Sequence, residues 1–191
     1  KFNDDLSKFI HMLIEDEFNL FLIGDLENIR IKNKNIFTSE EFCIEKNLMD
    51  IAAIYFSNFF IGPHSGPLHL AGIFKVSSFV LNCYPFWQST FNENDFLLHP
   101  KVFFKNNKNN EIPLIELYQT NSPLIYGKDF QEYCLVNNDF DTLKEAWREF
   151  SDPAEKSRLN NLNKKFYENV PSDIPLKYLQ ARIFSKNLNI K

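Results

Sequence analysis

The sequence predicts an α/β fold: a Rossmann-like three-layer domain with a mostly parallel sheet and helices at the C-terminal end. Short apolar runs, typical of buried strands, alternate with segments of helical periodicity, and this alternation indicates parallel βαβ units. The chain has 191 residues, of which 44% are hydrophobic, with 21 Phe but only 5 Gly. That composition supplies a bulky core for one domain.

The first half of the chain shows the alternation most clearly. Apolar residues recur at helical spacing over residues 4–16. The continuous apolar run 20–23 predicts a buried strand, and Gly24 and Asp25 end it with a turn. We then expect strands at 36–37, 59–61 and 78–82, a largely buried helix over 48–56 and a helix over 67–74.

The second half continues with shorter signals. We expect a loop over 87–94, strands at 102–104 and 133–136, an Asn-rich turn over 106–110, and helices over 140–150, 154–170 and 176–187. Asp139 and the two asparagines before it supply the N-cap of the first of these helices. The domain would cover 1–152, and the helices of 153–191 would pack back on its sheet.

Charge and cysteine content narrow the class of protein. The formal net charge is −4 and the densest basic segment, 30–34, is a short polar turn, so we expect no nucleic-acid partner. Three distant cysteines fit neither a disulfide framework nor a metal site and favour a reducing compartment, such as the cytoplasm. No apolar run approaches the ~18–20 residues of a transmembrane helix. The chain begins without Met, so we expect a piece of a longer protein.

The most informative motif is FFIGPHSGPLHLAG, over residues 59–72. A strand, a tight turn and a helix in this order leave backbone N–H groups free to hold a phosphate. Gly62 is expected to let the chain turn without a Cβ conflict, and Ser65 to cap the helix. Gly66 would let a phosphate approach the backbone, and Pro67 suits the first helical turn.

Two histidines flank this turn. His64 precedes the cap and His69 follows within the helix, and either can add a hydrogen bond to a bound anion. Neither an H-x-x-x-H pair nor a Cys/His cluster at ligand spacing occurs, so we expect no metal site.

The motif resembles a family of glycosyltransferases. Residues 65–71 are similar to the core of the D-S-G-P-x-H-L-A stretch of heptosyltransferase-type enzymes. In a related group of bacterial putative glycosyltransferases, Gly-Asp, Met/Leu-Asp and Asn recur at places that correspond here to residues 24–25, 49–50 and 82. His64 departs from the pattern, because heptosyltransferases have an acidic residue there, and this implies a different sugar or donor geometry.

The resemblance implies the C-terminal, nucleotide-sugar-binding half of a two-domain GT-B glycosyltransferase. Residues expected to hold the donor diphosphate are Gly62, Ser65, Gly66, Pro67, Leu68 and His69. Gly24, Asp25 and Glu45 would face the nucleotide or sugar, and His64 is the candidate catalytic residue. The nucleotide sugar would be a substrate with no further cofactor or metal. The acceptor, a glycan or lipid-linked molecule at or near a membrane, and the catalytic base would involve an N-terminal domain absent here.

Two other functions stay open. A nucleotide-sugar epimerase shares a Ser-Gly turn before a helix, but would need acidic catalytic residues that His64 and Ser65 do not provide. A non-catalytic binding module could keep the same fold without turnover.

Overall fold

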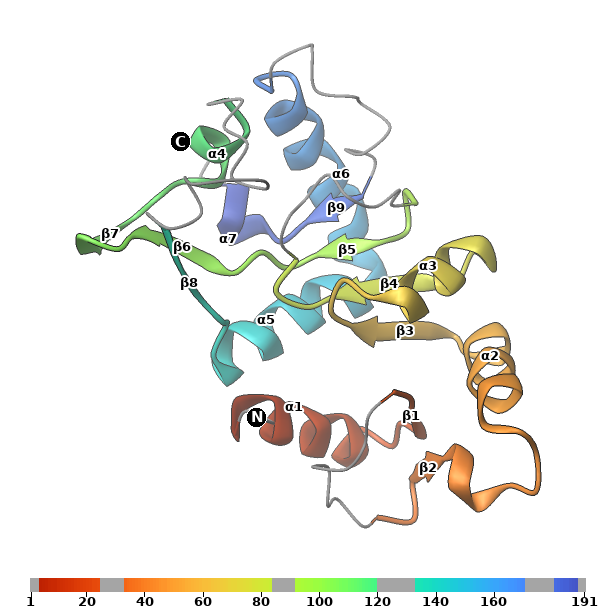
Figure 1. The fold of residues 1–191 in the computed structure, drawn as a ribbon. Coiled ribbons are helices and arrows are strands. Elements are labelled where there is room, and N and C mark those ends of the chain that lie inside the picture. The colour runs from red at the N-terminus through yellow and green to blue at the C-terminus, as the bar shows by residue number, and fades with distance from the viewer. Residues whose placement is uncertain (1–3, 25–32, 84–91, 120–132, 171–180, 189–191) are drawn as a thin grey trace.

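A parallel four-stranded sheet organises the computed structural model, which describes residues 4–24, 33–83, 92–119, 133–170 and 181–188. Its strands lie in the order β3 (Phe59–Gly62), β4 (Ser77–Val80), β5 (Phe96–Leu97) and β9 (Arg182–Ile183) (Figure 1). All three neighbouring pairs are parallel. Helices cover both faces, so the predicted α/β, Rossmann-like fold is confirmed.

The β3–α3–β4 unit carries the motif. Helix α3 (Gly66–Ile73) connects β3 to β4, and the two strands pair from Phe59 with Ser77 to Gly62 with Val80. The bounds of β3 and of α3 lie within one residue of those expected from the sequence. The turn between them, 63–65, therefore lies at the carboxyl edge of the sheet.

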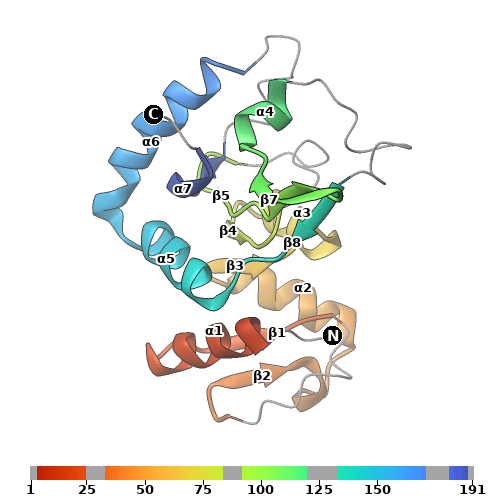
Figure 2. The ribbon, with the colours of Figure 1, turned by 90° about the vertical axis from the view of Figure 1, so that its left-hand side faces the viewer.

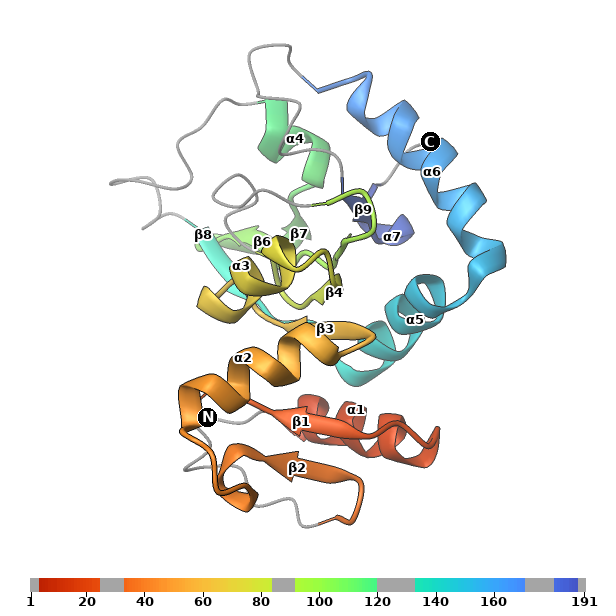
Figure 3. The same ribbon diagram turned by 90° about the vertical axis from the view of Figure 1, so that its right-hand side faces the viewer.

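A second, two-stranded parallel sheet precedes this unit, with β1 (Leu20–Leu22) paired to β2 (Ile36–Thr38). Helix α1 (Asp4–Glu15) comes before it, and the 3-10 turn η1 (Ser39–Glu41) and helix α2 (Lys46–Phe56) follow. In all three ribbon views β1 lies between β2 and β3 (Figures 1–3). The spatial order of strands therefore reverses between β1 and β3, as at the switch point of a doubly wound fold.

The outer part of the chain forms an antiparallel sheet in the order β7–β6–β8. Strand β6 (Lys101–Phe104) pairs with β7 (Asn107–Glu111) and with β8 (Tyr133–Val136). The prediction of an Asn-rich turn over 106–110 is thus wrong from residue 107 onward. The asparagines follow a tight connection and enter an edge strand, where cross-strand pairing overrides their low strand propensity. Helix α4 (Leu114–Gln119), which the sequence did not predict, follows β7.

The last described segment returns to the central sheet. Helices α5 (Phe140–Ser151) and α6 (Pro153–Tyr167) begin as expected, and β9 and the short helix α7 (Ser185–Leu188) follow. A continuous helix over 176–187 was therefore wrong at Arg182 and Ile183, which are strand. Both residues are buried and pair with β5, so sheet formation decides their conformation.

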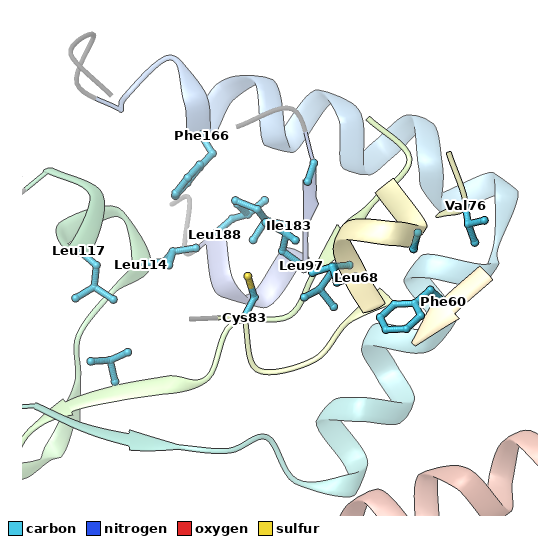
Figure 4. Close-up of a cluster of buried hydrophobic side chains, with 14 of the residues drawn as sticks. Phe60, Leu68, Val76, Cys83, Leu97, Leu114, Leu117, Phe166, Ile183 and Leu188 are labelled. Atoms are coloured by element: carbon cyan, nitrogen blue, oxygen red, sulfur yellow. The ribbon is translucent and has the colours of Figure 1, made fainter. Parts of the chain in front are cut away.

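The core lies on both faces of the sheet because successive strand residues point to opposite sides. Phe79 and Phe96 pack with Phe9 and Trp147 on the face covered by α1 and α5. The next residue of each strand, Val80 and Leu97, belongs to the opposite cluster. That cluster also contains Phe60, Leu68, Val76, Cys83, Ile183 and Leu188 (Figure 4). The two clusters fill the space between the sheet and the helices on each of its faces, so the domain has three layers: helices, sheet and helices.

Candidate anion site at the start of α3

The turn between β3 and α3 has the geometry of a helix start. Ser65 is the N-cap, with φ −160° and ψ 170°, and its carbonyl accepts a hydrogen bond of 3.1 Å from the Leu68 amide. The Ser65 hydroxyl forms no capping hydrogen bond. The expected cap position is therefore correct, but the cap acts through the backbone.

Gly66 is the sterically open residue of the turn. It is exposed, and a Cβ built on it would meet no heavy atom within 4 Å. A ligand can therefore approach this backbone closely, as the phosphate hypothesis requires. Among the residues 65–68, Pro67 has no N–H and the Leu68 N–H donates to Ser65, which leaves the amides of Ser65 and Gly66 as the expected anion donors.

Gly62 has a different role from the one expected. It is the buried last residue of β3, not part of the turn, and its φ is not positive. A Cβ on Gly62 would lie 2.9 Å from Cζ of Phe60, a buried ring. A side chain on Gly62 would therefore force the Phe60 ring to shift within the core.

Leu68 and Pro67 fix the turn to the domain. The Leu68 side chain is 4% exposed and packs in the core cluster with Phe60 and Ala71. Pro67 lies in the first turn of α3, where its missing N–H costs no hydrogen bond. Leu68 therefore anchors the start of α3 to the core, while Gly66 faces outward.

The structure brings His64 and His69 together beside Gly66. Their ring centroids are 5.5 Å apart and the rings meet at 83°. Partial burial, followed by the charge of His69, lowers the pKa of His64 from 6.5. His64 is therefore neutral at pH 7 and can donate one hydrogen bond, and a bound anion would favour its protonated form.

Gly24 and Glu45 form a second group, at the start of α2. Gly24 follows β1 with φ +100°, a left-handed conformation that favours glycine, and its carbonyl accepts a hydrogen bond of 3.0 Å from Lys46 Nζ. Glu45 is the N-cap of α2, and its Oε2 accepts a hydrogen bond of 3.0 Å from the Leu48 amide. Glu45 thus has a structural partner where a nucleotide contact was expected. Asp25 lies outside the described residues.

A buried hydrogen-bond network next to this edge was missed by sequence reasoning. Asn82, with φ +47°, accepts hydrogen bonds of 3.0 Å and 2.8 Å from the backbone and side-chain amides of Asn138. The Asn138 side chain also donates to the His99 carbonyl at 2.9 Å, and Nδ1 of His99 lies 2.9 Å from the Cys83 carbonyl. These contacts hold the loops after β4 and β5 against the start of α5.

His99 is almost completely buried in this network, with 1% of its surface exposed. Burial lowers its pKa to about 4, so the ring stays neutral at physiological pH. Of the network's members, only Asn82 stood out in the sequence, through the resemblance described above. Nothing local marks His99, because its partners are distant in the chain.

Metal and membrane features can be assessed for the described residues only. Among them, no three His, Cys, Asp or Glu side chains gather in an arrangement that could hold a metal ion. No helix within the described ranges combines the length and the apolar character needed to cross a bilayer.

Comparison with known proteins gives no match. No family model, no curated protein and no solved structure is significantly similar to this chain. The functional argument therefore depends on the residues and geometry described above.

Proposed function

We propose that this chain is the donor-binding domain of a metal-independent GT-B glycosyltransferase, in which the start of α3 binds the diphosphate of a nucleotide sugar. The observation that carries the proposal is the open backbone at Gly66, at the carboxyl end of β3. That position borders the reversal of strand order between β1 and β3, where open α/β sheets bind ligands.

The electrostatics of the turn suit a departing nucleoside diphosphate. When the bond between the sugar and the phosphate oxygen breaks, negative charge develops on that oxygen. The amides of Ser65 and Gly66 and the positive end of the α3 dipole would stabilise this charge. His64 and His69 would add hydrogen bonds, and His64 would gain a proton more readily once the anion is bound.

The catalytic base and the acceptor site would belong to another domain. The proposal assigns the catalytic base and the binding of a glycan or lipid-linked acceptor to a further domain, on the cytoplasmic side of a membrane. The isolated chain would accordingly bind donor without transferring sugar.

Calorimetric titration with UDP-, GDP-, ADP- and CMP-sugars tests the proposal. We expect one of these donors to bind, and Gly66→Trp to weaken it at least tenfold, because the indole would fill the approach to the backbone. The melting temperature of Gly66→Trp should stay near that of the unmodified chain, since no atom opposes a side chain there.

Ala154→Trp is the matched control. Ala154 is an exposed residue in the first turn of another helix, α6, and its replacement should leave donor affinity unchanged. If no donor binds, the proposal fails. If binding survives Gly66→Trp, the ligand site lies elsewhere on the molecule.

A further inference from the structure

Helix α2 presents an apolar stripe that no other part of the described chain covers. Leu48, Ile51 and Tyr55 follow one another at spacings of three and four residues and are 62%, 38% and 57% exposed. Only Ile54 of this helix is buried, so the predicted largely buried helix is wrong. In Figure 1 α2 lies at the right-hand edge of the molecule, and Figure 3 looks directly onto it.

The exposed surface extends beyond the stripe at both ends. We call the following residues the α2 face: Ile44, Leu48, Ile51, Tyr55, Phe56 and Ile73. The Tyr55 ring links its parts, with centroids 4.9 Å from Phe56 and 5.2 Å from Phe74, the neighbour of Ile73. The face therefore spans α2 and the end of α3.

The area of the α2 face is that of a protein interface. Its six side chains are between 38% and 81% exposed. At roughly 200 Å² for a whole large side chain they expose on the order of 700 Å². This exceeds the ~300–600 Å² of the largest apolar patch on a typical monomer, and it is close to one partner's share of a standard interface, about 800 Å².

We propose that the α2 face pairs with the α2 face of a second copy of this chain, with the two helices antiparallel about a twofold axis. Residues at alternating spacings of three and four are those with which one helix packs on another. In a twofold dimer the same patch faces itself, so one self-complementary surface is sufficient.

The charges around α2 favour the antiparallel orientation. Exposed carboxylates of Glu40, Glu41 and Glu45 cluster at its start. The exposed Lys75 lies next to the other end of the face, beyond Ile73. An antiparallel pair sets each acidic start opposite the basic end of the partner, whereas a parallel pair would bring the carboxylates together. Lys46, also at the start, is hydrogen-bonded to Gly24.

The dimer would leave the proposed anion site open. Ile73 is the last residue of α3 and Gly66 the first, so the interface contacts the helix at the end remote from the site. The two properties can therefore be tested separately.

Sedimentation velocity over a range of concentrations tests the pairing. We expect the unmodified chain to dimerise with a dissociation constant in the micromolar range or tighter. Leu48→Glu combined with Tyr55→Glu should weaken dimerisation at least 100-fold. Because both side chains are largely exposed, the circular-dichroism spectrum should remain that of the folded chain.

Phe104→Glu combined with Val136→Glu is the matched control. These residues are 46% and 44% exposed, but they lie on β6 and β8, so this variant should remain dimeric. Ile51→Cys in a Cys43→Ser background should form a disulfide with the same residue of the second copy on oxidation, because Ile51 is the residue of the α2 face at the middle of the helix. A chain that stays monomeric at all concentrations, or a dimer that survives the α2 substitutions, overturns the proposal.

Discussion

His99 is a histidine whose surroundings exclude water almost completely. It is buried within the loops that follow β4 and β5, and burial lowers its pKa from 6.5 to about 4. The folded protein therefore binds fewer protons than the unfolded chain between these two values. Stability is complete above pH 6.5 and is lost as the pH falls toward 4.

We predict that protonation of His99 lowers the free energy of unfolding by about 3 kcal/mol between pH 6.5 and 4, because burial lowers its pKa from 6.5 to about 4. His64, whose pKa is also lowered, acts in the same direction. Urea unfolding at a series of pH values measures the effect. His99→Asn keeps a donor for the Cys83 carbonyl but cannot titrate, so it should flatten the slope; an unchanged slope would contradict the assignment.

The site could be predicted at residue level only where its chemistry is local. Ser65 and Gly66 could be predicted because the residue preferences of turns and helix caps act over only a few positions. The role of Gly62 could not be predicted in this way, because it depends on the close approach of the Phe60 ring on the same strand. The contacts of His99 join loops far apart in the chain, and no spacing in the sequence records them.

At the level of elements, helices and strands were predicted correctly where the apolar pattern of the segment is long enough to recognise. The helices α1 and α5 and the strands β3 and β4 lie within two residues of their expected bounds. The strands β5 and β9 contain two residues each, too few to show a period, and are defined by pairing with distant partners. The α2 helix was located correctly, but its apolar residues were taken for core, whereas Leu48, Ile51, Tyr55 and Phe56 are exposed.

Glu45 allows a test of an element and of the site together. Glu45→Ala removes the acceptor for the Leu48 amide at the start of α2 and should lower the free energy of unfolding by about 1 kcal/mol. Glu45→Ser, which preserves a capping oxygen, should restore most of it. Both values come from urea unfolding.

Donor titration of the same two variants separates capping from ligand binding. We expect affinity to stay unchanged in Glu45→Ser, because the carboxylate already has a backbone partner. A loss of affinity in Glu45→Ser at normal stability would instead place Glu45 in the nucleotide pocket.

At the scale of the whole molecule, residues 181–188 belong to the central core. Ala181, Ile183 and Phe184 are no more than 1% exposed. The Ile183 amide donates to Asn163 Oδ1 at 2.8 Å, which ties β9 to α6. Glu149 of α5 also accepts a hydrogen bond of 3.1 Å from the Ser185 amide, so two helices and the sheet meet around this segment.

Ile183→Ala should therefore destabilise the whole domain. We expect a loss of about 2–5 kcal/mol in one cooperative transition, from lost burial and the cavity left between the sheet and α6. Val136→Ala, at a half-exposed position on β8, should cost less than about 0.5 kcal/mol. Equal losses in the two variants, measured by thermal unfolding, would show that β9 is peripheral.

The pairing of β5 with β9 also has a consequence for how the chain folds. One side of β5 pairs with β4, but the other pairs with Arg182 and Ile183, which follow α5 and α6 in the chain. Until these two residues dock, that side of β5 is an open strand edge, and such edges recruit strands from other chains. Because β5 and β9 are far apart in the chain, bringing them together closes a long loop. We therefore expect docking of residues 181–188 to be the late and slow step of folding. During synthesis, this is the interval in which the nascent chain is most exposed to aggregation and most dependent on chaperones.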